Sequence, residues 1–556
     1  MDPRESIVYQ IWPRSFYDSN GDGIGDLPGV AAKLDYLHEL GVDTVWLSPI
    51  FPSPNNDYGY DISDYRAVSP EFGTMEDFEA LVARAGERKI KILLDLVPNH
   101  TSDRHAWFQA ALADPESKYR DYYIFRKGKN DGPPNNWMSF FGGSAWTKDE
   151  KSGEYYLTSF TPQQCDLNWE NAGLRAEMYD MMRFWMDKGI GGFRIDVVNL
   201  LKKPEGLPDK DPHKRGLQFP GKLTTAQPGI HEILREMNEE VFSKYPDCLT
   251  VGEGCLVGIE DVPDFTSPER RELTMMFHFD LATLGCGPLG KYDFRKLYRF
   301  TTLEFKRVSD AWQLEMQRAN GWVGNYLSNH DQPRQLDRFG SVDERFRRAS
   351  AKALCLYNMT LRGTPFIYQG EECGMTNLAL EPHEWKDFEA LNSFKLLQSM
   401  MHVPKALATK IVKRATRDNA RTPVQWDGGR NAGFTTGTPW LRVNPNHTTV
   451  NIQDDMTHMD SIVGFYKRAI ALRKEHSALV WGEYAPVDRD NPRVIAYTRA
   501  QAGGERLLVV INLTGKSAKA RLPEKKGAEC LLYTHSSRPL AAEVLLLPYE
   551  GLVYKL

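Results

Sequence analysis

Several short apolar segments of the chain end in side chains that acid–base or nucleophilic chemistry uses. If these segments are parallel strands, their carboxyl ends lie at one rim, where loops carry catalytic groups. Three carboxylates at one rim would suit proton transfer combined with nucleophilic attack. A single aspartate after a strand is ordinarily a helix cap, whereas the whole set at one rim is not explained that way. The set is Asn99, His100, Arg194, Asp196, Glu253, His330 and Asp331.

Eight apolar, β-rich segments alternate with helix-sized amphipathic stretches such as 75–89. Near-continuous valine, isoleucine and leucine are typical of parallel strands covered on both faces. Eight such units favour an α/β fold of the (β/α)₈ TIM barrel type, with an open doubly wound sheet as the structural alternative. The segments are 6–12, 42–51, 90–97, 190–198, 248–253, 275–280, 321–331 and 363–372.

The spacing of these segments also predicts further domains. The stretch 101–168 is too long for an ordinary loop and is predicted to be an inserted subdomain after the third strand. Residues 480–556 alternate in strand fashion between turn-like AGGE and TGKS, which indicates a C-terminal antiparallel β-sandwich. The barrel itself is then assigned to 1–100 and 169–479, and Ser461 is expected to cap a helix that begins at 462.

Bulk properties narrow the classes of function. The 556 residues carry a net charge of −5, with both signs mixed along the chain, which gives no reason to expect a nucleic-acid partner or an anionic membrane surface. The first residues contain no apolar stretch of signal-peptide length, and the apolar runs are too short for a membrane span. Seven scattered cysteines fit a reducing compartment, so a cytoplasmic location is expected. The oligomeric state is left open, a monomer included.

Sequence motifs around the strand ends resemble the α-amylase superfamily, glycoside hydrolase family 13. DLVPNH (95–100), GFRIDVVN (192–199), VGEG (251–254) and YLSNHD (326–331) are similar to its four conserved regions. NDYGYDISDY (56–65), QCDLN (164–168) and RDNARTPVQWD (417–427) resemble its oligo-1,6-glucosidase branch. The resemblance runs through the whole chain in the right order.

The resemblance implies a retaining mechanism with two displacements. Asp196 matches the nucleophile, Glu253 the general acid/base and Asp331 the third carboxylate, which grips sugar hydroxyls. Arg194, two residues before Asp196 on a strand, would emerge on the same face and favour the ionised carboxylate. Retention requires the carboxyl groups of Asp196 and Glu253 to be about 5–5.5 Å apart.

The resemblance also implies a substrate site for one terminal glucose. His100 and His330 match hydroxyl-binding histidines, although a buried histidine serving the backbone is the alternative for either one alone. Asp57 and Tyr60 would close the non-reducing end of the pocket, with Tyr60 under the sugar ring. Arg417 is the candidate for a further hydroxyl contact, and Arg421 competes with it. Phe141 and Phe160 could line the pocket or simply pack.

The segment DSNGDGIGD places oxygen ligands at alternate positions, which is the pattern of a loop wrapped around Ca²⁺. Its oxygens would come from Asp18, Asn20, Asp22, Asp26 and the carbonyl of Ile24. A solvated polar turn is the alternative. The family's metal in the same loop favours the ion, with a structural role; catalysis itself needs no cofactor.

The expected substrate is a short α-linked glucose oligosaccharide, attacked from its end. Val197 accompanies α-1,6 preference in this branch, since a β-branched side chain narrows the leaving-group subsite. Cys165 and Cys255 depart from the usual motifs, both on the leaving-group side. A sucrose isomerase or transglucosylase, a trehalose-6-phosphate hydrolase and a non-catalytic amylase-like binding subunit are the alternatives. The segment 278–290 lacks the Arg-Leu-Asp-Arg-Asp run of isomerases.

Overall fold

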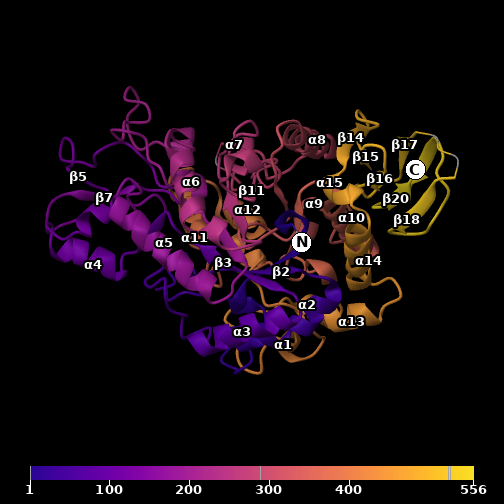
Figure 1. Cartoon of the computed structure of the whole chain (residues 1–556), viewed down its shortest axis with the longest axis horizontal. Coiled ribbons are helices and arrows are strands. Elements are labelled where there is room, and N and C mark those ends of the chain that lie inside the picture. Colours follow the sequence, from indigo (N-terminus) through magenta and orange to yellow (C-terminus); the bar gives the residue numbers. More distant parts are fainter. Residues whose placement is uncertain (1, 289, 524, 526) are drawn as a thin grey trace. The chain divides into compact units, whose positions relative to one another are not determined.

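The computed structural model describes residues 2–288, 290–523, 525 and 527–556. The chain forms two compact units. The first unit comprises Met1–Val45, Arg84–Ile90 and Asp280–Leu556, and the second comprises Trp46–Ala83 and Lys91–Phe279. Figure 1 shows the chain coloured along its sequence.

The second unit holds four parallel strands that carry most of the predicted chemistry. They are β3 (Lys91–Leu96), β9 (Gly192–Ile195), β10 (Leu249–Glu253) and β11 (Met275–Phe277), in the order β11-β10-β9-β3. Nearly all their residues are buried, as expected of parallel strands covered on both faces. In this register Asp95 pairs with Arg194, and Glu253 pairs with Phe277.

In the first unit, β1 (Val8–Ile11), β13 (Thr364–Tyr368) and β12 (Gly324–Asn325) are parallel neighbours. The chain passes from one unit to the other inside β2 (Thr44–Leu47), which stands between β3 and β1 in the strand order of the sheet. The sheet has eight parallel strands, one within each predicted segment. The predicted fold class is therefore confirmed.

Helices follow the strands along the chain. The predicted helix at 75–89 is observed as α3 (Met75–Glu87), and α14 (Ile462–Glu475) begins after Ser461, whose hydroxyl accepts the Gly464 N–H at 2.8 Å. The remaining helices of the second unit are α4 (Ala106–Ala113), α5 (Ala172–Asp187), α6 (Ile230–Glu240) and α7 (Val262–Thr266). Those of the first unit are α1 (Leu27–Ala32), α2 (Leu34–Leu40), α8 (Thr302–Arg318), α9 (Gln335–Phe339), α10 (Glu344–Thr360), α11 (Phe388–Ser399), α12 (Lys405–Ala415), α13 (Ile452–Thr457) and α15 (Ala478–Trp481).

The predicted insertion contains small sheets of its own. Strands β5 (Phe125–Arg126), β7 (Tyr155–Leu157) and β6 (Trp146–Lys148) form one antiparallel sheet, and β4 (His100–Ser102) pairs with β8 (Gln164–Asp166). Helix α4 packs on the first sheet through Phe108, whose ring contacts those of Phe125 and Tyr156. The boundaries 101–168 stay a prediction.

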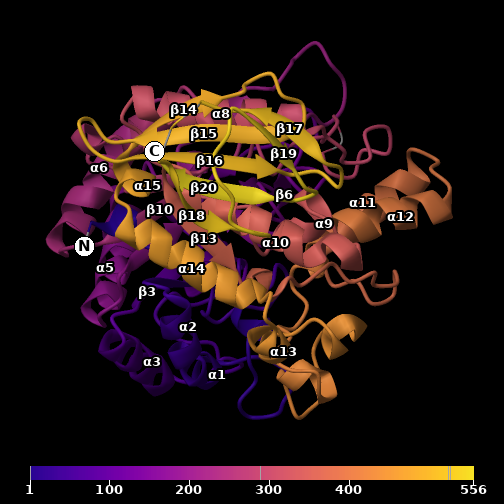
Figure 2. The same cartoon turned by 90° about the vertical axis from the view of Figure 1, so that its right-hand side faces the viewer.

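The C-terminal residues form the predicted antiparallel sandwich. A five-stranded sheet has the order β14-β15-β16-β20-β18 and faces the pair β17-β19 across a shared apolar core (Figure 2). Their bounds are β14 Glu483–Val487, β15 Val494–Ala500, β16 Arg506–Asn512, β17 Ala518–Arg521, β18 Glu529–Tyr533, β19 Glu543–Leu546 and β20 Gly551–Lys555. None of the helices in the described part of the chain combines the length and apolar character that a bilayer crossing needs.

Candidate active site

Arg194 is the centre of a buried charged cluster in the second unit. Its Nη1 donates to Asp95 Oδ1 at 2.8 Å and to Asp196 Oδ1 at 2.7 Å. Its Nη2 lies 2.8 Å from Glu253 Oε1. Asp95 is its register partner on β3, Asp196 follows directly after the end of its own strand, and Glu253 ends the neighbouring strand. One planar guanidinium therefore holds the predicted nucleophile and the predicted acid/base side by side.

The second oxygen of Glu253 is held as well. The backbone N–H of Val197 donates to Glu253 Oε2 at 3.2 Å. The two flanking glycines explain how the strand end fits. A Cβ on Gly252 would lie 2.6 Å from a Leu273 methyl, and one on Gly254 would lie 2.6 Å from the Met276 sulfur. The VGEG pattern is thus a packing requirement that brings the carboxylate to its place.

Val197 adopts a left-handed backbone conformation, with φ 34° and ψ 42°. This region is strongly disfavoured for a β-branched residue, at a cost of about 1–3 kcal/mol. The turn directs the Val197 N–H at Glu253, one residue after Asp196, which itself follows the end of β9. The strain therefore lies at the point where the two carboxylates are oriented.

The electrostatics of this cluster favour a retained proton. Burial raises the pKa of Asp196 well above its usual range, the neighbouring Glu253 and Asp95 raise it further, and Arg194 lowers it. One guanidinium contacts three carboxylates, so full ionisation would leave like charges in a site with little solvent. A proton retained in this cluster leaves a protonated carboxyl group beside ionised ones, and the Arg194 guanidinium is the neighbour that favours the ionised form of Asp196.

Asp95 connects this cluster to Tyr60. Its Oδ2 accepts the Tyr60 hydroxyl at 2.9 Å and the Trp46 indole N–H at 3.2 Å. The Arg194 guanidinium lies over the faces of both rings, 5.2 Å from the Trp46 centroid and 5.9 Å from that of Tyr60. Sequence reasoning missed Asp95 and Trp46 as site residues. Asp95 could have been predicted, since a carboxylate next to the last residue of a strand that is otherwise apolar from Ile92 onward is unusual.

His100 and Asp57 are linked to the same network. His100 Nε2 lies 3.0 Å from the carbonyl oxygen of Tyr60, and Gln164 Nε2 contacts both that oxygen at 3.2 Å and Asp57 Oδ2 at 3.4 Å. Burial lowers the pKa of His100 to about 4, so its ring is neutral near pH 7. The Phe160 ring packs on it at 5.1 Å, and Phe141 packs on Phe160.

A second charged cluster, in the first unit, surrounds Asp331. His330 Nε2 lies 3.1 Å from Asp331 Oδ2, Arg421 Nη2 lies 3.0 Å from Oδ1, and Arg417 Nη1 lies 3.5 Å from the same oxygen. Burial alone would raise the pKa of Asp331, but these three neighbours hold it well below its usual range. Arg417 is in turn anchored by its Nε on Asp387 Oδ1 at 2.8 Å. Both candidate arginines thus contact Asp331, with Arg421 at the shorter distance.

Gln10 and Trp12 hold the ring of His330, and Arg421 holds its backbone. Gln10 Nε2 lies 2.8 Å from its Nδ1, Trp12 stacks on it at 5.3 Å, and Arg421 Nε donates to its carbonyl oxygen at 3.0 Å. Gln10 and Trp12 come from the end of β1. Neither was a sequence candidate, because nothing in SIVYQIW distinguishes them from ordinary strand residues.

Each unit thus brings its own predicted residues together. In the second unit Asp57, Tyr60, His100, Arg194, Asp196 and Glu253 form one connected network. In the first unit His330, Asp331 and Arg417 form another. That all nine surround one sugar stays a prediction, as does the separation of the two catalytic carboxyl groups.

The predicted metal loop is tightly folded on its own oxygens. Asp18 accepts the backbone N–H groups of Asn20, Gly21 and Gly23, Asn20 accepts that of Asp22, and Asp22 accepts that of Ile24. Asp26 caps α1 through the Gly29 N–H and also binds Ser19. Among the described residues no three histidine, cysteine, aspartate or glutamate side chains gather as a metal-binding group, so a cation here would depend on Asn20 and the Ile24 carbonyl.

Cys165 and Cys255 are the two departures from the expected motifs. Cys165 is fully buried in β8, where it pairs with Thr101 of β4. The carbonyl oxygen of Cys255 accepts the Asn199 Nδ2 donor at 2.8 Å.

Comparison with known proteins agrees with this fold. The family model "Alpha amylase, catalytic domain" matches residues 10–482. An oligo-1,6-glucosidase of Parageobacillus thermoglucosidasius is 47% identical over 561 residues, which cover 100% of this chain and 98% of that protein. The crystal structure of Bacillus licheniformis trehalose-6-phosphate hydrolase has a TM-score of 0.93 and 43% identity, covering 100% of this chain and 99% of that one. The trehalulose synthase of Pseudomonas mesoacidophila MX-45 has a TM-score of 0.91 and 42% identity, with 99% and 98% covered.

The fold and the paired carboxylates define a glycoside hydrolase built on a (β/α)₈ barrel. The chain belongs to the alpha-amylase family.

Proposed function

We propose that the protein is a retaining, exo-acting α-glucosidase that removes terminal α-linked glucose from short oligosaccharides. The observation that carries the proposal is the single guanidinium of Arg194, which binds Asp196 at 2.7 Å and Glu253 at 2.8 Å. Two carboxyl groups held by one planar group are close neighbours, as retention requires. Full-length relatives named oligo-1,6-glucosidase support the substrate class.

In the proposed reaction Asp196 attacks the anomeric carbon while Glu253 protonates the leaving oxygen. Water then attacks the glucosyl–Asp196 ester, and Glu253 takes its proton. Arg194 keeps both carboxyl groups in place through the two steps, and the Val197 N–H fixes the remaining oxygen of Glu253. The neutral ring of His100 is proposed to donate to a hydroxyl of the bound glucose, with Tyr60 beneath the ring and Asp57 closing the far end.

Asp331, His330 and Arg417 are proposed as hydroxyl-binding partners of the same glucose, from their sequence motifs. The low pKa of Asp331 supports this role, because an ionised carboxylate accepts hydroxyl hydrogen bonds and stabilises a developing positive charge. Arg421 and Arg417 hold that carboxylate in the ionised form.

An α-1,6 preference is the proposed linkage specificity. Val197 follows the nucleophile and is held in one conformation by its own strained turn, so its branched side chain offers little adjustment to different leaving groups. A single side chain contributes about 1–3 kcal/mol of discrimination, which amounts to a preference.

A structural Ca²⁺ is proposed for the loop that precedes α1. Asp18, Asn20, Asp22, Asp26 and the carbonyl of Ile24 supply the hard oxygen ligands that Ca²⁺ takes. The ion would brace the loop and takes no part in the bond-breaking steps. The cytoplasm is the proposed location, because all seven cysteines are free thiols, three of them buried.

The function is tested by incubating the purified enzyme with maltose, isomaltose, panose, sucrose and trehalose 6-phosphate, and following released sugars by NMR. Free α-glucose appearing first from isomaltose and panose supports the proposal. Trehalulose or isomaltulose from sucrose would make the protein an isomerase, and exclusive cleavage of trehalose 6-phosphate would make it a phosphosugar hydrolase. The Asp196→Ala variant is the control for activity from contaminants.

A further inference from the structure

Lys203 is a buried cation in the second unit, with three acceptors around its ammonium group. Its Nζ donates to the carbonyl oxygen of Leu200 at 2.7 Å and to Asn99 Oδ1 at 2.7 Å, and it lies 2.9 Å from Asp166 Oδ2. Its side chain is 8% exposed. The three acceptors match the three N–H donors of an ammonium group, so the head of this lysine has one fixed orientation.

Asn99 takes its orientation from this lysine. Because Asn99 Oδ1 accepts from the ammonium, its amide nitrogen must face the opposite way, where it lies 3.3 Å from Asp166 Oδ2 and 3.2 Å from His100 Nδ1. A flipped amide would place NH₂ against the ammonium and a carbonyl oxygen against the Asp166 carboxylate. Both contacts are repulsive, so the charge of Lys203 selects one of the two amide orientations.

The amide of Asn99 then selects the tautomer of His100. An NH₂ group facing Nδ1 requires Nδ1 to be an acceptor, so the ring proton lies on Nε2. On the other side of the ring, Nε2 faces the carbonyl oxygen of Tyr60 at 3.0 Å, which can only accept, and Gln164 Nε2 at 3.1 Å. The Gln164 amide has two N–H groups, and these have acceptors of their own in the Tyr60 oxygen at 3.2 Å and Asp57 Oδ2 at 3.4 Å. The Asn99 amide and the Tyr60 carbonyl therefore specify the same neutral ring, with an N–H at Nε2.

We propose that Lys203 is a positioning residue for glucose binding, acting through Asn99 to keep His100 in the Nε2–H form. This inference rests on the proposed function, in which His100 donates to a hydroxyl of the bound glucose. In the Nε2–H form the one ring proton faces the Tyr60 carbonyl and is the proton that a glucose hydroxyl would share. An Nδ1–H tautomer would leave Nε2 without a proton and would place its lone pair against that carbonyl. A lysine that contacts no sugar would thus govern whether the sugar site presents a donor.

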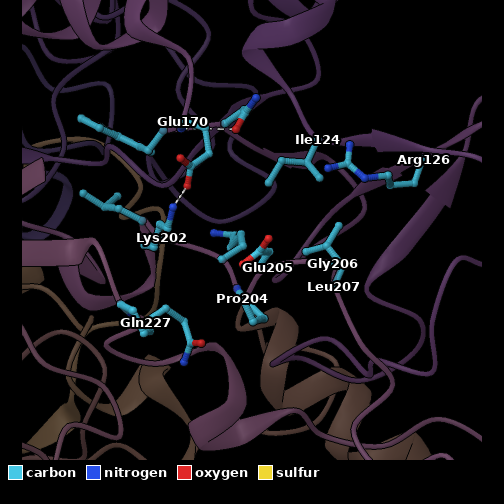
Figure 3. Close-up of a pocket in the computed structure, with 14 residues that line it drawn as sticks. Ile124, Arg126, Glu170, Lys202, Pro204, Glu205, Gly206, Leu207 and Gln227 are labelled. Atoms are coloured by element: carbon cyan, nitrogen blue, oxygen red, sulfur yellow. Dashed lines mark hydrogen bonds and ion pairs between the residues drawn. The ribbon is translucent and has the colours of Figure 1, made fainter.

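The adjacent Lys202 provides a matched control. Lys202 and Lys203 both line a pocket of about 530 Å³ in the second unit, in which Lys202 forms an ion pair with Glu170 (Figure 3). Glu170 is largely exposed, so this pair belongs to the surface and contributes little. Lys202→Met therefore removes the same charge and the same side-chain length as Lys203→Met, at the adjacent position, but it leaves the contacts of Asn99 unchanged.

The decisive experiment is a double-mutant cycle between Lys203→Met and His100→Gln, with kcat/KM for a nitrophenyl α-glucoside as readout. Lys203→Met should lower kcat/KM by about 10- to 100-fold, the range for a misplaced binding group. In the His100→Gln background the same change should cost less than about 3-fold, because its target is gone. Lys202→Met should stay within about 2-fold of the wild type. Equal losses from Lys203→Met in both backgrounds would overturn the proposal.

A second route covers the case in which Lys203→Met does not fold, since it leaves Asp166 buried and unpaired. Lys203→Met combined with Asp166→Asn removes both charges. The double-mutant cycle between Lys203→Met and His100→Gln is then repeated with Asp166→Asn present in every protein. Lys203→Met should again lower kcat/KM by about 10- to 100-fold when His100 is present and by less than about 3-fold when it is replaced.

The tautomer itself is read by ¹⁵N NMR of histidine-labelled full-length protein, with the His100 signals assigned by their loss in His100→Gln. The wild type should show the Nε2–H ring, and the lysine variant a shift toward a mixture. Identical ring signals in both proteins would overturn the proposal. This measurement needs no turnover, so it decides the positioning role even if the panel of sugars shows that the enzyme is not an α-glucosidase.

Discussion

Replacing Arg194 by methionine tests how the buried cluster is held together. The side chain is 1% exposed and contacts Asp95, Asp196 and Glu253 at 2.7–2.8 Å. Removing one partner of a buried ion pair typically costs about 3–5 kcal/mol, because the remaining charge is left uncompensated. We therefore expect a loss of about that size in the free energy of unfolding near neutral pH. Activity should fall about 10²- to 10³-fold or more, since both catalytic carboxyl groups lose their anchor.

The loss of stability should depend on pH, with a definite sign. Burial already holds the pKa of Asp196 well above its usual range, and removing the guanidinium takes away the neighbour that lowers it, so the folded-state pKa of Asp196 rises further above its unfolded value of about 4. The folded variant then binds more protons than the unfolded chain, so its stability rises as the pH falls toward 4–5. The deficit relative to the wild type should accordingly be larger at pH 7.5 than at pH 5.

Urea denaturation at both pH values, together with rates on a nitrophenyl α-glucoside, measures these effects. Arg66→Met is the matched control, because Arg66 forms an ion pair with Asp180 in which the two side chains are 43% and 58% exposed. Such surface pairs contribute about 0–1 kcal/mol. Equal losses in the two variants, or a deficit for Arg194→Met that is the same at both pH values, would refute the electrostatic reasoning.

Three further predictions concern specificity, the metal loop and another buried carboxyl group. Val197→Ala and Val197→Thr should raise the ratio of maltose to isomaltose hydrolysis, and an unchanged ratio of initial rates would remove the basis of the proposed linkage preference. Chelation with EDTA should lower the melting temperature, measured by calorimetry, more than it lowers activity at 25 °C. Asp22→Ala should abolish this effect of the chelator. A melting temperature that EDTA does not change would contradict the calcium proposal. Burial raises the pKa of Glu371 to about 8. Between the unfolded pKa of about 4.5 and this value, unfolding releases a proton. The free energy of unfolding therefore falls across that pH range by up to about 1.4 kcal/mol per pH unit. Glu371→Gln should remove that slope from urea denaturation series, and a parallel slope in both proteins would contradict it.

The strand ends were predictable from sequence because buried parallel strands are nearly continuous runs of apolar residues. Apolar runs fixed where β9 and β10 lie, and the two-residue repeat of a strand placed Arg194 and Asp196 on one face. The structure adds the reason why the two carboxylates are neighbours. Asp95, Arg194 and the end of β10 are adjacent in register, which depends on strand order and cannot be read from any single segment.

Other site residues were missed because their types have commoner roles elsewhere. Lys203 lies in a loop, where a lysine is ordinarily solvated, and its burial follows from how that loop folds against Asn99 and Asp166. The competition between Arg417 and Arg421 had the same origin. The two residues are four apart in one irregular segment, and their distances to Asp331 depend on a short 3₁₀ turn at Arg417–Asn419.

The metal loop shows the opposite limitation, in which a pattern fits two structures. Asp26 occupies a ligand position of the motif, and it is also the N-cap of α1, with its Oδ1 accepting the Gly29 N–H at 2.6 Å. An aspartate three residues before a glycine N–H satisfies both descriptions. Sequence spacing alone therefore does not separate a ligand from a cap.

The proposed retaining mechanism depends on a covalent glucosyl ester at Asp196. The direct measurement is to trap the intermediate with 5-fluoro-α-D-glucosyl fluoride, digest the protein and locate the added mass by tandem mass spectrometry. We expect one labelled peptide, with the fluoroglucosyl group on Asp196 and no label in Asp196→Ala. A label on another carboxylate, or full turnover with release of β-glucose and no adduct, would contradict it.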